Sequence, residues 1–241
     1  MSVNGGRSLV LDEDSELAEL VSRQQLQTAR QASLASIVEL PLGSWDARVD
    51  SGRAREGFGL LVLGGVLVRR VGFGGRFGAE LLADGDLLRP WEFDGDESIG
   101  FETTWRVLAN ARLAVLDAVW TERMASYTRV GPALAGRALA RSRRLAVMMA
   151  IAQQPRLDER LWMLFWELAD RHGRVHPDGV YLDLPLTHEV LSHLVAARRP
   201  SVSGALTKLA DQGRLRRDGR RWVLTGDPPA ASQLRRTSTA G

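Results

Sequence analysis

The sequence predicts an α+β fold in which a long helix joins an N-terminal sheet domain to a C-terminal winged helix-turn-helix. Three observations support this prediction. Short apolar runs separated by Gly, Asp and Pro fill residues 37–117, helical periodicity follows from residue 118 onward, and two closely spaced short helices precede a basic hairpin near the C-terminus. The 241 residues are enough for two domains of ordinary size.

The composition is that of a globular protein and restricts the cofactors that the chain can hold. Hydrophobic residues make up 44% and charged residues 25% of the sequence, and there is no cysteine. Without cysteine the chain has no disulfide, thiolate zinc site or cysteine-ligated iron–sulfur cluster. Residues 1–14 lack the apolar run of a signal peptide, and every apolar run is far shorter than the roughly 18 residues of a membrane span. We therefore expect a cytoplasmic protein that has no membrane partner.

Positive charge gathers in the C-terminal half of the chain. Residues 1–127 include 13 basic and 19 acidic residues, a net charge of −6, whereas residues 128–241 include 19 basic and 10 acidic residues, a net charge of +9. A basic half of this kind favours a polyanionic partner.

The N-terminal part predicts a tail, one helix and then many short strands. Residues 1–14 are expected to form a loose tail. Leu17 and Leu20 belong to a set of apolar residues at helical spacing, which predicts a helix over residues 15–34. The short apolar runs of residues 37–117 are typical of a sandwich or barrel, and the glycine-rich run 72–78 predicts a hairpin turn within it.

A long helix is predicted over residues 132–154, with Pro132 in its first turn and Pro155 just beyond its end. Shorter helices are predicted on either side, over residues 118–124 and 157–172. Small and apolar residues recur along the long helix at alternating spacings of three and four, as in a coiled-coil seam. A helix that packs only on its own domain is the alternative. The residues expected at a homodimer interface are Ala138, Ser142, Leu145, Met149 and Ala152.

The C-terminal third predicts a winged helix-turn-helix. Thr187 is suited to cap a helix over residues 188–195, and a three-residue turn, 196–198, leads into a second helix over residues 199–211. Residues 215–224 then read as a hairpin with an Asp-Gly turn, which forms the wing.

The residue types on this unit are those that bind duplex DNA. Arginine can bind guanine O6 and N7 together, serine can bind bases or phosphates, and a helix N-terminus favours phosphate. The predicted base-reading residues are Arg199, Pro200, Ser201, Ser203 and Gly204. The predicted contacts to the DNA backbone are Thr187, His188, Arg198, Lys208, Arg216, Arg217, Arg220 and Arg221. An ordinary helical subdomain with a solvated arginine face is the alternative interpretation.

Residues 186–224, which begin Leu-Thr-His-Glu-Val-Leu-Ser-His-Leu, resemble the winged helix-turn-helix of the cyclic-AMP receptor protein/fumarate-nitrate regulator (Crp/Fnr) family. Gly85-Asp86 resembles that family's Gly-Asp turn, and residues 106–117 resemble its last sensor strands. The resemblance covers residues 15–226. It implies a β-roll, cyclic-nucleotide-binding-like sensor over 15–127, a dimerisation helix over 128–155, a winged helix-turn-helix over 156–226 and a flexible tail over 227–241.

The resemblance implies a transcription regulator that binds an inverted-repeat DNA site as a homodimer and is not an enzyme. RNA polymerase is a candidate further partner. Arg199 occupies the family's first base-reading position, whereas Pro200 replaces a commonly acidic reader and Gly204 replaces a second arginine. The alternative is a winged-helix module that binds a partner protein without sequence-specific DNA binding, which salt-dependent binding to duplex DNA would distinguish.

The sensor is expected not to bind cyclic AMP in the family's manner. Cyclic-nucleotide sensors of the family hold the phosphate with a short helix that opens Gly-Glu and with a later Arg-Ser or Arg-Thr pair. Pro90-Trp91 and Phe101-Glu102 stand at these two places, and residues 92–102 are rich in acidic side chains. A different ligand and no ligand both remain open.

Other cofactors are not expected. No histidine or cysteine precedes His172, so the sensor lacks those axial ligands for haem. The histidines have no metal-ligand spacing, and no metal site is predicted. Trp91 and Trp105 are candidates to line an apolar ligand pocket, although tryptophans in such a region more often belong to the core.

Overall fold

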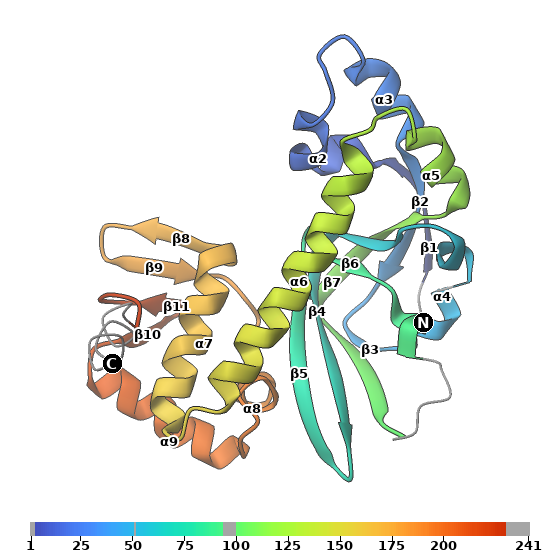
Figure 1. The fold of residues 1–241 in the computed structure, drawn as a ribbon. Helices are drawn as coiled ribbons and strands as arrows, with labels where there is room; N and C mark the ends of the chain where they lie inside the picture. Colours follow the sequence, from blue (N-terminus) through green and yellow to red (C-terminus); the bar gives the residue numbers. More distant parts are fainter. Residues whose placement is uncertain (1–2, 51, 94–99, 230–241) are drawn as a thin grey trace, which may run out of the picture. The chain divides into compact units, whose positions relative to one another are not determined.

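The fold contains one sheet in each of two compact units, residues 1–145 and 146–241 (Figure 1). The structure is a computed structural model, and it describes residues 3–50, 52–93 and 100–229. The boundary between the units falls inside the central helix α6 (Val130–Ala152), which lies within the range 128–155 given to the dimerisation helix. Most of the predicted C-terminal tail, residues 227–241, lies outside the described residues. Within the described ranges, no helix is long and apolar enough to cross a membrane.

The N-terminal unit is built on a seven-stranded sheet with the order β1-β2-β7-β4-β5, to which β3 adds on β7 and β6 on β4. Its long strands β4 and β7 pair antiparallel from Gly59 opposite Leu116 to Gly72 opposite Glu102. The strands are β1 Val3–Leu9, β2 Leu34–Leu40, β3 Gly43–Trp45, β4 Gly59–Phe73, β5 Arg76–Ala83, β6 Leu87–Leu88 and β7 Glu102–Leu116.

The pairing of β4 with β7 is interrupted by register shifts, which bend the sheet. Gly65 lies at one of these shifts with a φ of +97°, and a Cβ atom there would come within 2.4 Å of the Asn110 carbonyl oxygen. Only glycine fits such a close approach of two strands.

The two faces of this sheet bury two separate apolar clusters. Leu60 and Leu113 belong to one cluster, whereas their neighbours Leu61 and Ala114 belong to the other. Successive side chains of a strand point to opposite faces, so a strand buried on both faces reads as a continuous apolar run. This explains the unbroken apolar runs that the sequence shows in this region.

The residues before β2 correct two predictions. Residues 3–14 are not a loose tail, because β1 pairs with β2 and Val10 and Leu11 are buried. Residues 15–34 are not one helix, because helix α2 begins where the Asp14 side chain accepts from Leu17 N and ends at Glu19. The helices and 3-10 turns of this unit are α1 Val10–Glu13, α2 Ser15–Glu19, α3 Leu26–Ala32, α4 Ala47–Asp50, η1 Arg53–Glu56, η2 Pro90–Phe93 and α5 Ala118–Met124.

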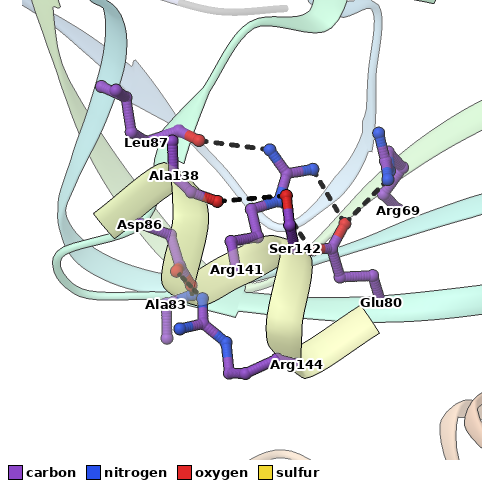
Figure 2. Close-up of polar contacts among 9 residues, drawn as sticks. All are labelled: Arg69, Glu80, Ala83, Asp86, Leu87, Ala138, Arg141, Ser142 and Arg144. Atoms are coloured by element: carbon purple, nitrogen blue, oxygen red, sulfur yellow. Dashed lines mark hydrogen bonds and ion pairs between the residues drawn. The ribbon is translucent and has the colours of Figure 1, made fainter. Parts of the chain in front are cut away.

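The central helix α6 (Val130–Ala152) is fastened to the sheet by ion pairs. Arg141 Nε lies 2.6 Å from Glu80 Oε1, and its Nη1 donates to the carbonyl oxygen of Leu87 at 3.2 Å (Figure 2). Arg144 binds Asp86, whose carboxylate also accepts from Ala83 N.

The carboxylate of Glu80 is the centre of this network. It also binds Arg69 of β4, with Nη2 3.0 Å from Oε2, and both Glu80 and Arg69 are buried (Figure 2). A charge removed from water is costly unless it is paired and hydrogen-bonded. The two arginines therefore allow Glu80 to be buried between β4, β5 and α6.

The C-terminal unit combines three helices with a four-stranded antiparallel sheet of order β10-β11-β9-β8. Its core includes Phe165 and Trp222, whose ring centroids are 5.0 Å apart. The short edge strand β8 and its partner β9 were not predicted from the sequence. The elements are α7 Leu157–His172, β8 Gly173–His176, β9 Gly179–Leu182, α8 His188–Leu194, α9 Arg199–Asp211, β10 Leu215–Asp218 and β11 Arg221–Leu224.

The ion pairs of Glu80 give a prediction for stability. Glu80→Gln removes the buried carboxylate charge that Arg69 and Arg141 share, so we expect the free energy of unfolding to fall by about 3–5 kcal/mol. Urea denaturation measures this change. Asp46→Asn, which breaks the exposed pair between Asp46 and Arg48, is the control and should cost less than about 1 kcal/mol. Similar losses for the two variants would contradict the structural role of Glu80.

Candidate DNA-binding interface

The helix-turn-helix is formed by α8 and α9, as predicted. The Thr187 hydroxyl accepts from Val190 N at 3.2 Å and caps α8. In the turn, Ala196 has a φ of +50°, which is uncommon for a residue with a side chain and reverses the chain direction within three residues. Val202 and Leu209, on the inner face of α9, are buried, whereas residues 199–201 at its start are exposed.

The first turn of α9 presents most of the predicted base-reading residues to solvent. Arg199, Pro200, Ser201 and Gly204 are all exposed. An added Cβ atom at Gly204 would meet nothing within 4 Å, so the surface there is open. The exposed residues lie together at one end of the helix, as a reader of base edges requires.

Ser203 departs from this arrangement. It is half-buried, and its Oγ lies 2.8 Å from His188 Nδ1 at the start of α8. The same hydroxyl group donates to the Arg199 carbonyl oxygen at 3.3 Å. Ser203 and His188, which were predicted to contact bases and backbone separately, therefore contact each other.

The hairpin of β10 and β11 forms the predicted wing. Asp218 pairs with Arg221, so the two-residue turn consists of Gly219, with a φ of +58°, and Arg220. Arg217 stacks on the buried Trp222, with its guanidinium carbon 4.2 Å from the ring centroid. The Trp222 ring thus anchors the wing and carries a cation on its face.

Two other basic side chains of the wing, Arg216 and Arg221, have acidic partners. Arg216 binds Asp178 and lies 3.3 Å from the Tyr181 hydroxyl, which itself donates to Asp178. Arg221 Nε lies 3.5 Å from an Asp183 carboxylate oxygen. These pairs are exposed, so they weaken but do not remove the positive potential of the wing.

Lys208 is bound within its own unit. Its Nζ lies 2.6 Å from the buried Asp158 carboxylate, which also accepts from Arg156 at 2.8 Å. Hydrogen bonds from Arg156 and from Lys208 hold the pKa of Asp158 well below its ordinary value. At pH values above the unfolded carboxyl pKa of about 3.9, the ion pairs of Asp158 stabilise the folded unit. Their contribution is lost as the pH falls through the lowered pKa of Asp158 in the folded state.

The two sensor tryptophans are buried in the core. Trp105 packs edge-to-face against Trp45 at 5.3 Å between ring centroids. The rings of Trp45 and Trp105 line a cavity of about 530 Å³ together with polar residues that include Thr103 and Arg106. Trp91 is not among the described residues that line it.

The structure describes the two places at which the resemblance would put the family's phosphate contacts. Residues 90–93 form a 3-10 turn, and Phe101-Glu102 leads directly into β7. Asp94, Asp96 and Glu97, which belong to the acidic run of residues 92–102, lie outside the described residues.

The comparison with known families concerns the C-terminal unit. Residues 159–230 match the family of Crp-like helix-turn-helix domains. We refer to the matched residues, which are similar to that family, as the Crp-like domain. The Crp-like domain begins in α7 and includes α8, α9 and the wing, so the predicted reading helix and wing both belong to it. No curated protein sequence gives a significant match to the chain.

Solved structures of regulators share the fold over most of the chain. FixK2 from Bradyrhizobium japonicum is 17% identical, with a TM-score of 0.59 over 84% of this chain and 96% of that one. The c-di-GMP-responsive regulator CLP from Xanthomonas campestris is 17% identical, with a TM-score of 0.56 over 89% and 100%. A CRP-family transcriptional regulator from Thermus thermophilus is 20% identical, with a TM-score of 0.52 over 84% and 97%.

These similarities confirm the predicted resemblance and the α+β fold class. A sheet domain, a central helix and a Crp-like helix-turn-helix domain follow one another along the chain, as in Crp/Fnr-family regulators. The chain therefore shares the fold of these regulators. The roles of single residues toward DNA remain predictions.

Proposed function

We propose that the protein is a sequence-specific DNA-binding transcription regulator and not an enzyme. The observation that carries this proposal is the exposed Arg199 on the first turn of α9, within a Crp-like helix-turn-helix domain. Among the described residues it makes no ion pair, so its guanidinium group can bind a base edge without first losing a protein partner.

The distribution of ion pairs supports different roles toward DNA for the eight basic residues of 186–224. Lys208, Arg214, Arg216 and Arg221 each bind an acidic side chain, and Arg217 stacks on Trp222. Within the described part of the chain, the basic side chains of this segment that make no ion pair or ring contact are Arg198, Arg199 and Arg220. We propose that Arg199 reads bases and that Arg198 and Arg220 contact phosphates.

Two arginine variants test these roles. Arg199→Ala should weaken binding to a selected site by ~1–3 kcal/mol while changing the affinity for random duplex much less. Arg220→Ala should weaken both duplexes alike and lower the dependence of affinity on salt, because it removes one phosphate contact. Fluorescence anisotropy across a salt series measures both effects, with the exposed Arg23→Ala of the N-terminal unit as control.

Either of two results would count against these roles. Equal losses on selected and random DNA for Arg199→Ala would remove its base-reading role. Binding that is neither sequence-selective nor salt-dependent in the wild type would favour a winged helix that binds a protein partner.

We also propose that the regulator is a homodimer that binds an inverted repeat through the exposed face of α6. Leu139 and Met149 are large apolar side chains on this helix, with 72% and 71% of their surface exposed. Of the predicted seam residues, Ala138, Ser142 and Met149 are exposed, whereas Leu145 and Ala152 are half-buried. Leu139, Ser142 and Met149 therefore define the proposed seam, and a two-fold dimer matches a two-fold symmetric site.

Charge placed in the seam should weaken the dimer. We expect Met149→Glu to shift the protein toward the monomer, since it puts two carboxylates at an apolar contact. Val147→Glu is the control. Val147 is also exposed, but it lies two residues before Met149 and therefore about 200° away from it around the same helix. Light scattering over a range of concentrations measures the mass. A Met149→Glu variant as dimeric as the wild type would place the interface elsewhere.

Finally, we propose that the sensor does not bind cyclic AMP in the family's manner and that it holds no haem, iron–sulfur cluster or metal. The ion pairs of Arg141 with Glu80 and of Arg144 with Asp86 fasten the central helix to the sheet without a small molecule. Phe101-Glu102 supplies no cation where a phosphate clamp is expected. RNA polymerase remains a predicted partner, and the cytoplasm the predicted location.

Calorimetric titration tests the claim about nucleotides. Cyclic AMP and cyclic GMP are expected to give no saturable binding tighter than ~100 μM, which corresponds to about 5.5 kcal/mol. Saturable binding of either nucleotide below that concentration would show that the sensor keeps a phosphate site.

A further inference from the structure

The hydrogen bond between His188 and Ser203 crosses the two helices of the helix-turn-helix. His188 is the first residue of α8, and Ser203 lies in the second turn of α9. The two side-chain atoms, Nδ1 and Oγ, are 2.8 Å apart, and both residues are half-buried. The contact is therefore a defined polar link between the start of one helix and the start of the other.

Ser203 extends this link to the residue that is proposed to read DNA. Its hydroxyl group donates to the Arg199 carbonyl oxygen, one helical turn earlier. A hydroxyl group has a single proton, so when that proton is given to Arg199, Oγ accepts from His188. The imidazole then donates through Nδ1, and two successive hydrogen bonds join α8 to the backbone of Arg199.

The backbone of this turn is held by a helical hydrogen bond from Val202 N to the Arg198 carbonyl oxygen at 3.1 Å. The N-cap residue of α9 is Arg198, which makes no side-chain cap hydrogen bond. The contacts beneath the turn come from apolar residues such as Val202 and Leu206, which hold the helices together without directing a polar group. The His188–Ser203 link therefore adds a directed polar contact between α8 and the start of α9.

We propose that His188 is a positioning residue for DNA recognition, which holds Ser203 and through it the first turn of α9 that bears Arg199. This inference rests on the proposed DNA-binding function and deepens it. It assigns Ser203 to the link between the helices instead of to a base, and it assigns His188 to the same link instead of to a phosphate.

The length of the replacing side chain separates the link from a phosphate contact. His188→Asn places an amide nitrogen near the position of Nδ1, whereas His188→Gln places it near the position of Nε2. His188→Ala and Ser203→Ala remove the link from either side. All four variants are compared with the wild type on a selected site and on random duplex, across a salt series, and the unfolding temperature of each is measured.

We expect His188→Ala and Ser203→Ala each to weaken binding to the selected site about five- to tenfold, the effect of one lost hydrogen bond. The affinity for random duplex and the salt dependence should not change. His188→Asn should recover most of the loss, and His188→Gln should not. Because the two residues act through one contact, the double alanine variant should be no more than about twofold weaker than either single variant.

Several results would overturn the inference. Equal losses on both duplexes with a smaller salt dependence would assign His188 to a phosphate, and recovery by His188→Gln alone would do the same. Unchanged selective binding in Ser203→Ala, which keeps a residue of high helix propensity, would show that the link does not position Arg199. If the wild type selects no DNA site, the proposed function itself fails. If the wild type is selective but the variants do not behave as expected, only the inference about His188 fails.

Discussion

The position of the central helix in the N-terminal unit depends on the buried carboxylate of Glu80. Arg69 binds it from β4 and Arg141 binds it from α6, so one acidic side chain joins two strands to the helix. Charges buried in this way tolerate little displacement, because separation leaves each of them unpaired in a medium of low dielectric constant. The arginines at 137, 141 and 144 all use one side of α6, so the exposed Leu139 of the proposed dimer seam lies on another side of the helix.

Ion pairs and cation–π contacts also hold parts of the Crp-like domain together. Arg214, Arg216, Arg217 and Arg221 are bound to acidic or aromatic side chains of the same unit, and Lys208 pairs with Asp158, so these contacts hold the wing and join α7 to α9. Within residues 186–224, the described basic side chains without such partners are Arg198, Arg199 and Arg220, at the start of α9 and in the turn of the wing. Their placement carries more information than the net charge of the chain.

Local sequence signals were sufficient for the helices of the C-terminal half. Periodicity and capping residues predicted α7 and α9 to the residue, and the glycine-rich run near residue 74 forms the turn between β4 and β5. The prediction failed where stability comes from distant partners. The strand β1 contains two glycines and lacks alternation, and it forms because β2 pairs with it. The His188–Ser203 contact also escaped prediction, because a sequence does not show which side chains of two crossing helices meet.

The edge of the Crp-like domain's sheet has a consequence for solubility. The strand β8 has only four residues and ends the sheet, and its Val175 side chain is 87% exposed. An open strand edge offers unpaired backbone groups to the edge of another molecule, and short length with flanking charge counters that tendency. Arg174 and His176 flank Val175, and Pro177 follows immediately without a backbone N–H to donate. The strand thus discourages edge-to-edge aggregation in a protein whose proposed assembly depends on helices.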